Sequence, residues 1–399
     1  MKTIELEFTL MRQDSQDPAE LLALLQEYEA KQRIKIHVTL LDWPNAWSEI
    51  SRAAIYSHGP DVSAVGTTWV ADLFGMNALA PLPQEEQYWL RNTSAYLPQA
   101  YAGCQIIGDP NLWAVPWVTG SRVIYYRRDW LQKAAVKEDK AFESVAALHA
   151  TLARLQKSGV LHPWVVTTQN SLNTLHHLAS WVWGFGGDFI SADGKQMLLR
   201  KEETLKGAAA YFALGAFLGP RGEDLNDANT HEMFWSGNAA VTIDGLWVLP
   251  AQKRVRDPEF LKNIGVALVP GVSFIGGTNL VLWKHSPNKK AALELMHFLT
   301  NPEAEMACFR NTGLLPTRLD LLQSGELMSD PIHLVFEKGL RTGRSWPNLR
   351  HGGLIENRLR NVLAEIWREV LKTPRPDLNT ILEKHFSALE ERMELILGS

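Results

Sequence analysis

Near the N-terminus, apolar and polar residues first alternate, as in a strand, and apolar residues then recur at helical spacing. These two patterns follow each other repeatedly along the chain. Alternation at 4–10 and at 34–40 predicts two strands, and leucines at helical spacing between Leu21 and Tyr28 predict a helix that joins them. A second helix and a short strand at 61–66 follow. Strands and helices in this order predict parallel βαβ units and an α/β fold.

The stretch 111–131, NLWAVPWVTGSRVIYYRRDWL, interrupts this alternation. It reads as two short strands, at 112–118 and 122–126, on either side of a Gly-Ser break. The alternation of strands and helices resumes after it, so we expect one lobe of the chain to give way to another here. A cleft forms where two lobes meet, and Trp117 is expected at its edge.

Ligands of parallel sheets bind beyond the carboxyl ends of the strands, and this rule predicts which loops face the cleft. In the first part of the chain these loops are 11–15, 42–45 and 66–69. In the second part, Asp244-Gly245-Leu246-Trp247 opens a helix at the end of a strand. The sequence therefore predicts one ligand site built from loops of both lobes.

Length and charge narrow the class of protein. A chain of 399 residues exceeds the size of a single hydrophobic core, so two domains are expected. The net charge of −4 is too small to indicate nucleic acid or an anionic membrane as partner. No run reaches the ~20 apolar residues of a membrane span. No secretory signal is visible at Met1, which leaves open a cytoplasmic protein or one whose signal has been removed.

Motifs for covalent or metal chemistry are largely missing. No nucleotide-binding glycine loop, nucleophile elbow or zinc-protease motif is present, and no metal or cofactor is expected. Cys104 and Cys308 are expected to be buried free thiols, with a single disulfide as the alternative. His176 and His177 are adjacent and so lie on different faces of a helix, which predicts one exposed and one packed histidine rather than a shared metal.

A pair of tyrosines and a set of aspartates also admit a functional interpretation. Tyr125 and Tyr126 could capture ferric iron, but adjacent strand residues point to opposite faces, which favours packing. A glycosidase needs two carboxylates in the cleft. Several aspartates lie near the ends of predicted elements, but no spacing singles out a pair among them: Asp14, Asp42, Asp61, Asp188 and Asp244.

Tryptophan is unusually frequent, with 15 residues against 8 tyrosines, and many tryptophans stand at breaks. Trp43 precedes Pro44, Trp117 follows Pro116, and Trp346 precedes a proline. Sugar rings have apolar C–H faces and polar edges, so they suit aromatic platforms rimmed by polar groups. Core packing is the alternative for each one. Five tryptophans at predicted cleft loops are candidate platforms: Trp43, Trp69, Trp117, Trp247 and Trp346.

An ordered series of short motifs resembles a known family. It includes Gly59-Pro60-Asp61-Val62, then Ala114-Val115-Pro116-Trp117 followed by Val123-Ile124-Tyr125-Tyr126, then Phe234-Trp235-Ser236-Gly237-Asn238, and finally Gly313-Leu314-Leu315-Pro316-Thr317-Arg318. The series covers nearly the whole chain and resembles the extracellular solute-binding proteins of ABC importers, in the sugar-binding group that includes maltose-binding protein. Asn238 stands where the family usually has lysine, and 142–144 lacks the usual Pro-Thr-Trp entry to a helix.

The resemblance implies the two-lobed type II periplasmic-binding-protein fold, each lobe a mostly parallel sheet flanked by helices. The first lobe would hold 1–116 and 276–325, and the second 117–275 and 326–399 with the C-terminal helices. The implied function is capture of a mono- or oligosaccharide by lobe closure and delivery to a membrane permease, without catalysis. The protein would be a monomer located in the periplasm or anchored outside the cell, and its export signal would be absent from this sequence.

Loop position gives candidate ligand contacts. Asp14 and Asp42 are expected to bind hydroxyls, and Trp43 and Trp69 to be platforms of the first lobe. From the second lobe we expect Trp117 and Trp247, from the returning segment Asn279 and Arg318, and as a lid Trp346. Two alternatives stay open: a carbohydrate-active hydrolase using cleft aspartates, and the same binding fold with an organophosphate or polyamine ligand.

Overall fold

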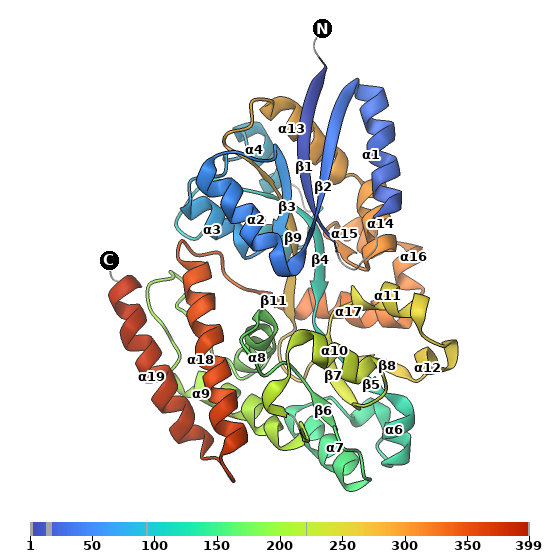
Figure 1. Cartoon of the computed structure of the whole chain (residues 1–399), viewed down its shortest axis with the longest axis vertical. Helices are drawn as coiled ribbons and strands as arrows, with labels where there is room; N and C mark the ends of the chain where they lie inside the picture. Colours follow the sequence, from blue (N-terminus) through green and yellow to red (C-terminus); the bar gives the residue numbers. More distant parts are fainter. Residues whose placement is uncertain (1–2, 13–17, 93–94, 221, 398–399) are drawn as a thin grey trace.

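The computed structural model describes residues 3–12, 18–92, 95–220 and 222–397, and these residues form two β-sheets with helices around each (Figure 1). In the described residues the larger sheet has seven strands in the order β10-β4-β9-β3-β1-β2, with β11 paired to β9. Its strands are β1 (Ile4–Arg12), β2 (Ile34–Asp42), β3 (Val62–Gly66), β4 (Val115–Ser121), β9 (Phe274–Leu282), β10 (Leu315–Pro316) and β11 (Arg344–Ser345).

The N-terminal part of the larger sheet forms as the hydrophobic pattern predicts. Strands β1 and β2 pair in parallel from Ile4 opposite Ile34 to Arg12 opposite Asp42, and β3 is parallel to β1. Helix α1 (Ala19–Gln32) joins β1 to β2 and buries Leu21, Leu25 and Tyr28. Helix α2 (Trp43–Tyr56) joins β2 to β3. The predicted βαβ units are confirmed, and the carboxyl ends of β1, β2 and β3 share one edge.

Strand β9 runs through a segment with two adjacent glycines, Gly276 and Gly277, a pair more typical of a loop. The structure has one continuous strand that pairs antiparallel with both β3 and β4. Gly277 has a φ of 145°, and a Cβ there would lie 2.2 Å from the carbonyl oxygen of Val118. The glycines therefore allow β4 and β9 to approach closely beside the irregularity between Pro116 and Val118, rather than forming a loop.

The smaller sheet has four strands in the described residues, in the order β6-β7-β5-β8. They are β5 (Val123–Arg127), β6 (Trp164–Val165), β7 (Val241–Asp244) and β8 (Ile264–Ala267). The chain changes sheets at Arg122, since β4 belongs to the larger sheet through Ser121. The change was expected near Pro116, before Trp117, so this part of the prediction was wrong.

Helices cover both sheets. Beside the larger sheet, in addition to α1 and α2, are α3 (Trp69–Gly75), α4 (Gln84–Asn92), α5 (Pro98–Ala102), α13 (Lys289–Leu299) and α14 (Pro302–Thr312). Between β5 and β9 come α6 (Arg128–Lys133), α7 (Val145–Lys157), α8 (Leu172–Gly184), α9 (Glu202–Phe212), α10 (Asp227–Trp235), α11 (Val248–Val255) and α12 (Pro258–Lys262), with the 3-10 turns η1 (Glu138–Lys140), η2 (Ala213–Phe217) and η3 (Gly222–Asp224).

The C-terminal region is helical, as predicted. Its helices are α15 (Leu319–Leu322), α16 (Gly325–Met328), α17 (Pro331–Thr342), α18 (Gly352–Lys372) and α19 (Leu378–Leu397). Helices α18 and α19 pack against α8 and α9 (Figure 1), and α18 also contacts α3 beside the larger sheet. Helix α18 is therefore in contact with a helix beside each of the two sheets.

The structure shows whether the cysteines and the paired histidines are buried. Cys104 and Cys308 are buried free thiols, as expected. His176 and His177 are both buried, so the expectation of one exposed histidine was wrong; α8 is surrounded on nearly all sides from Thr174 to Trp183. Among the described residues no helix combines the length and apolar character needed to cross a membrane.

Candidate ligand-binding site

A cavity of about 340 Å³ lies between the larger sheet, the smaller sheet and the start of α8. We call it the first chamber. From the side of the larger sheet it is lined by Trp43, Gly66, Thr67, Thr68, Trp69, Gly120, Gly276, Gly277, Thr278 and Leu314. From the other side it is lined by Arg122, Leu172, Asn173, His176, Asp244, Trp247 and Phe274. The carboxyl ends of β2 and β3 open onto it, as the rule for parallel sheets predicts.

Two tryptophans form the wall on the side of the larger sheet. Trp43 begins α2 directly after β2, and Trp69 begins α3 after β3. Their ring centroids are 5.4 Å apart with the planes at 63°, an edge-to-face contact that fixes both rings. A Cβ at Gly66 would lie 3.4 Å from the Trp69 ring, so the glycine leaves the ring close to the strand end. The wall is thus a broad, rigid aromatic surface.

Trp247 and Arg122 form the opposite wall. The Trp247 ring lies so close to the backbone that a Cβ at Gly245 would be 1.8 Å from it, so this position requires glycine. The Cζ atom of Arg122 lies 5.0 Å from the centroid of that ring, within the range of a cation–π contact. Asp244 accepts a hydrogen bond from the amide of Gly245 at 2.8 Å and faces His231 at 3.3 Å. An apolar ring face, a guanidinium and a carboxylate therefore stand side by side.

His176 supplies a neutral polar group between the walls. Its ring stacks on Phe274, with 3.7 Å between centroids and 17° between planes. Burial lowers the pKa of His176 well below its usual value, and the charge of Arg122 lowers it further. The Nη2 atom of Arg122 lies 3.1 Å from Nδ1 of His176. Because a guanidinium only donates, Nδ1 accepts and the proton of the neutral ring is on Nε2.

Three of the predicted contacts, Trp43, Trp69 and Trp247, line the first chamber. These three tryptophans lie in separate parts of the sequence, and each follows the end of a strand. Asp14 was also predicted, and it lies outside the described residues.

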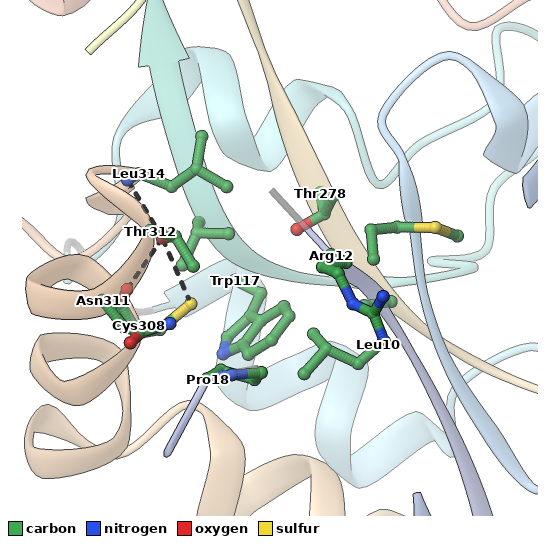
Figure 2. A pocket seen from close by; sticks show the side chains of 12 residues that line it. Leu10, Arg12, Pro18, Trp117, Thr278, Cys308, Asn311, Thr312 and Leu314 are labelled. Carbon is green, nitrogen blue, oxygen red and sulfur yellow. Dashed lines mark hydrogen bonds between the residues drawn. The ribbon is translucent and has the colours of Figure 1, made fainter. Parts of the chain in front are cut away.

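Trp117 is a core residue, and its predicted position at the cleft edge was wrong. It is 1% exposed, and its Nε1–H donates to the carbonyl oxygen of Leu299 at 2.8 Å. Figure 2 shows its ring among Leu10, Pro18 and Cys308, beside a space of about 10 Å³. That space is about the size of one water molecule. Alternation along β4 turns this side chain into the interior of the larger sheet, away from the first chamber.

Asn279 and Trp346 are also buried, and their predicted roles were wrong. Asn279 donates a hydrogen bond to the carbonyl oxygen of Gly103 at 2.8 Å, which satisfies a buried backbone group. Trp346 is 5% exposed and packs on Phe189 with 5.3 Å between ring centroids, so it forms part of the core and not a lid.

Asp42 and Arg318 lie apart from the first chamber, so the predicted contacts are not supported. The Asp42 side chain is largely exposed, 3.5 Å from Arg12. Arg318 pairs with Asp320 at 2.9 Å, and this contact is the main reason that the pKa of Asp320 is lowered. Both residues stand at strand ends, but their side chains turn to local partners.

Four lining residues that carry a charge, an amide or an aromatic ring lie outside the predicted cleft loops: Arg122, Asn173, His176 and Phe274. Arg122 had a signal in the sequence, because it is the only charged residue in the apolar stretch 115–126. The other three are brought to the chamber by the packing of α8 against β9, which no local pattern reveals.

Most of the aspartates considered for a glycosidase lie away from the first chamber. Of the described aspartates considered for a glycosidase, only Asp244 lines it. Asp61 accepts from Ser286 and from the amide of Glu7, and Asp188 pairs with Arg344, so both have structural partners elsewhere. In the part of the chain that the structure describes, no group of three or more His, Cys, Asp or Glu side chains is arranged to hold a metal ion.

Comparison with known proteins gives a family and a set of structural relatives. Residues 23–335 match the family described as "Bacterial extracellular solute-binding protein". The diacetylchitobiose-binding protein DasA of Streptomyces coelicolor is 22% identical over 345 residues, which cover 84% of this chain and 78% of that protein. The maltotriose-binding protein of Pyrococcus abyssi is 25% identical over 224 residues, covering 53% of this chain and 47% of that protein.

Solved structures share the fold. A solute-binding protein of an ABC transporter from Thermotoga lettingae, bound with α-D-tagatose, superposes with a TM-score of 0.84 at 19% identity, covering 99% of this chain and 100% of that one. The GacH receptor of Streptomyces glaucescens, studied unliganded and with acarbose, has a TM-score of 0.80 at 22% identity and covers 98% and 99%. These likenesses show the two-lobed α/β fold of periplasmic binding proteins.

Proposed function

The chain belongs to the bacterial extracellular solute-binding protein family, and from this premise we propose that it captures a carbohydrate in the first chamber and delivers it to the membrane permease of an ABC importer. It does so as a monomer and without catalysis, in the periplasm or at the outer surface of the cell. Closure of the two lobes around the ligand provides the signal to the permease. The first lobe holds the larger sheet, in which the chain runs through Ser121 and to which it returns at Phe274, and the second lobe holds the smaller sheet between them.

The observation that carries this proposal is the pairing of aromatic faces with polar groups across the first chamber. Trp43 and Trp69 face it from one side and Trp247 from the other. Arg122, Asn173 and Asp244 supply donors and acceptors beside the rings. A sugar offers both kinds of surface, and groups from both lobes reach it together only when the lobes close, so binding favours the closed form.

Named relatives support a carbohydrate ligand over the alternatives. Diacetylchitobiose and maltotriose are the ligands in the names of two of them. A polyamine site needs several unpaired carboxylates, whereas Asp244 is the single carboxylate among the described lining residues of the first chamber, and Arg122 is a cation beside it. A hydrolase of the usual kind needs a second carboxylate across from Asp244.

A thermal-shift screen tests the ligand class. We expect sugars to raise the unfolding temperature, because a ligand that binds only the folded state stabilises it by mass action. The panel contains glucose, N-acetylglucosamine, their α- and β-linked oligomers, glycerol phosphate, spermidine and putrescine. Stabilisation by a polyamine or a glycerol phosphate with none by any sugar would refute the proposed ligand, and release of monosaccharide from a bound oligomer would refute the absence of catalysis.

Trp43→Ala tests the aromatic platform. Losing the contact of one large side chain with the ligand removes about 1.5–3 kcal/mol, and each ~1.4 kcal/mol is tenfold, so we expect sugar affinity to fall by on the order of ten- to a hundredfold. Trp113→Ala is the matched control. Trp113 is another half-buried tryptophan, which packs on Phe74 and does not line the chamber. Equal losses in both variants, measured by calorimetric titration, would contradict a platform role for Trp43.

A further inference from the structure

A second chamber of about 740 Å³ continues from the first. Trp43, Trp69 and Leu172 line both chambers, so the two spaces meet at these side chains. The second chamber lies between α2 and α3 on one side and the N-terminal half of α18 on the other. Its other lining residues are Trp47, Asp72, Gly75, Met76, Arg350, His351, Gly353, Leu354, Glu356, Asn357 and Arg360.

The aromatic surface of the first chamber extends into the second. Trp47 lies one helical turn after Trp43 in α2, and its ring centroid is 5.3 Å from that of Trp69. Trp43, Trp69 and Trp47 therefore form one continuous strip of rings that leads from one chamber to the other. A strip of this kind suits a ligand made of repeated rings, each with an apolar face.

Polar groups of α18 face this strip. Glu356, Asn357 and Arg360 lie within about one turn of each other on α18 and line the second chamber. Glu356 is 5% exposed, and its Oε1 atom has no hydrogen-bond partner among the described residues; the same is true of Nε of Arg360. An unsatisfied polar group at a buried wall is costly, and a ligand hydroxyl is able to pair with it.

The protonation state of Glu356 at this wall suits a ligand hydroxyl group. Burial raises the pKa of Glu356 to about 8, and the nearby Asp72 raises it further while Arg360 lowers it. Below that pH the carboxyl group is neutral, and a neutral carboxyl both donates and accepts hydrogen bonds, as a sugar hydroxyl requires. The carboxylate of Asp72 is used differently: its Oδ1 accepts from the amide of Gly353 at 2.9 Å, which joins α3 to the first turn of α18.

We propose that the second chamber is a further sugar subsite, so that the ligand is an oligosaccharide that runs past Trp69 and places its outer unit between Trp47 and the polar face of α18. This inference rests on the proposed function. The first chamber, at about 340 Å³, is near the lower end of the ~300–1,000 Å³ found for small-molecule sites, while the second is more than twice as large. Asn357, Glu356 and Trp47 then select for ligand length, because they contact only the outer unit of a longer ligand.

A length series tests the subsite. Calorimetric titrations use glucose, maltose and maltotriose, and N-acetylglucosamine with its β-linked dimer and trimer. In the series that binds, we expect the trisaccharide to bind at least tenfold more tightly than the monosaccharide. Asn357→Leu removes a hydrogen-bonding side chain from the second chamber, and we expect trisaccharide affinity to fall by about tenfold while monosaccharide affinity is kept.

Arg358→Leu is the matched control. Arg358 is the next residue of α18, is exposed and does not line either chamber, so both affinities should stay as in the wild type. Equal affinity of the wild type for all three lengths would overturn the subsite, as would an equal loss for monosaccharide and trisaccharide in Asn357→Leu. Absence of binding by every sugar in both series would overturn the proposed function itself, a result distinct from binding without length dependence.

Discussion

Replacing Trp117 by alanine is expected to lower the free energy of unfolding by about 3–5 kcal/mol, the usual cost of truncating a fully buried tryptophan. The side chain is 1% exposed and meets Phe8 edge to face, with 6.4 Å between centroids. Its indole N–H also donates a hydrogen bond to the carbonyl oxygen of Leu299, the last residue of α13. Carbonyl groups in the last turn of a helix have no partner within the helix. The variant therefore loses packing and exposes a helix end. Chemical denaturation monitored by circular dichroism measures the change.

Trp117→Phe separates these two effects. It keeps most of the ring and loses only the donor to Leu299, so its cost should be close to the ~1–3 kcal/mol of one unsatisfied buried group. Sugar affinity of the folded fraction should be unchanged in both variants, because Trp117 does not line the first chamber. A stable Trp117→Ala protein with lost binding would show that the ring contacts the ligand after all.

Glu356 should make a contribution to the free energy of unfolding that is lost as pH rises from about 4.5 to 8. The pKa of Glu356 is raised to about 8 by burial first and by Asp72 next, against 4.5 for the ordinary side chain. Between these values the folded state binds a proton that the unfolded state has released. The free energy of unfolding then decreases with pH, by about 1.4 kcal/mol per unit for one such group. Burial also raises the pKa of Asp72, which acts in the same direction.

Glu356→Gln should remove this contribution, since an amide of similar shape does not titrate. Unfolding midpoints of the wild type and the variant are compared at pH 5, 6, 7 and 8. The variant should be the more stable protein at pH 8 and differ least at pH 5. Glu394→Gln, which changes an exposed carboxylate of α19, should leave the wild-type slope intact. A slope shared by all three proteins would exclude Glu356 as the titrating group.

Local sequence signals are reliable at helix starts, where residues close in sequence determine the structure. Serine is a preferred N-cap residue, and the hydroxyl of Ser144 accepts from the amide of Ala147 at 3.1 Å at the start of α7. A proline fits the first turn of a helix, and Trp43 with Pro44 begins α2. The end of β4 was misjudged because a Gly-Ser pair, usually a break, here continues a strand whose pairing partner, β9, is more than 150 residues away.

The candidate site was predicted in part. The correctly predicted residues stand at strand ends, and the wrongly predicted ones are residues whose side-chain direction depends on tertiary packing. Trp43, Trp69 and Trp247 follow strand ends, and the position of a strand end in a parallel sheet is set by its local sequence. Trp117 lies inside a strand that is buried on both faces, where a change of one residue reverses the face, so the exact register decided whether its ring faced the chamber. Trp346 has a proline beside it like a loop residue, yet Phe189 covers it from a distant part of the chain.

The sequence by itself determined the α/β class, the early βαβ units, the aromatic character of the site and the resemblance to a family of solute-binding proteins. These properties depend on the period of apolar residues and on motifs in order, both of which are written along the chain. Only the tertiary structure decided which tryptophans face the chambers, that His176 is held neutral against Arg122, and that α18 forms the wall of a second chamber. The reason is that burial, charge and shape at these positions are set by residues from distant segments, whose approach no local pattern encodes.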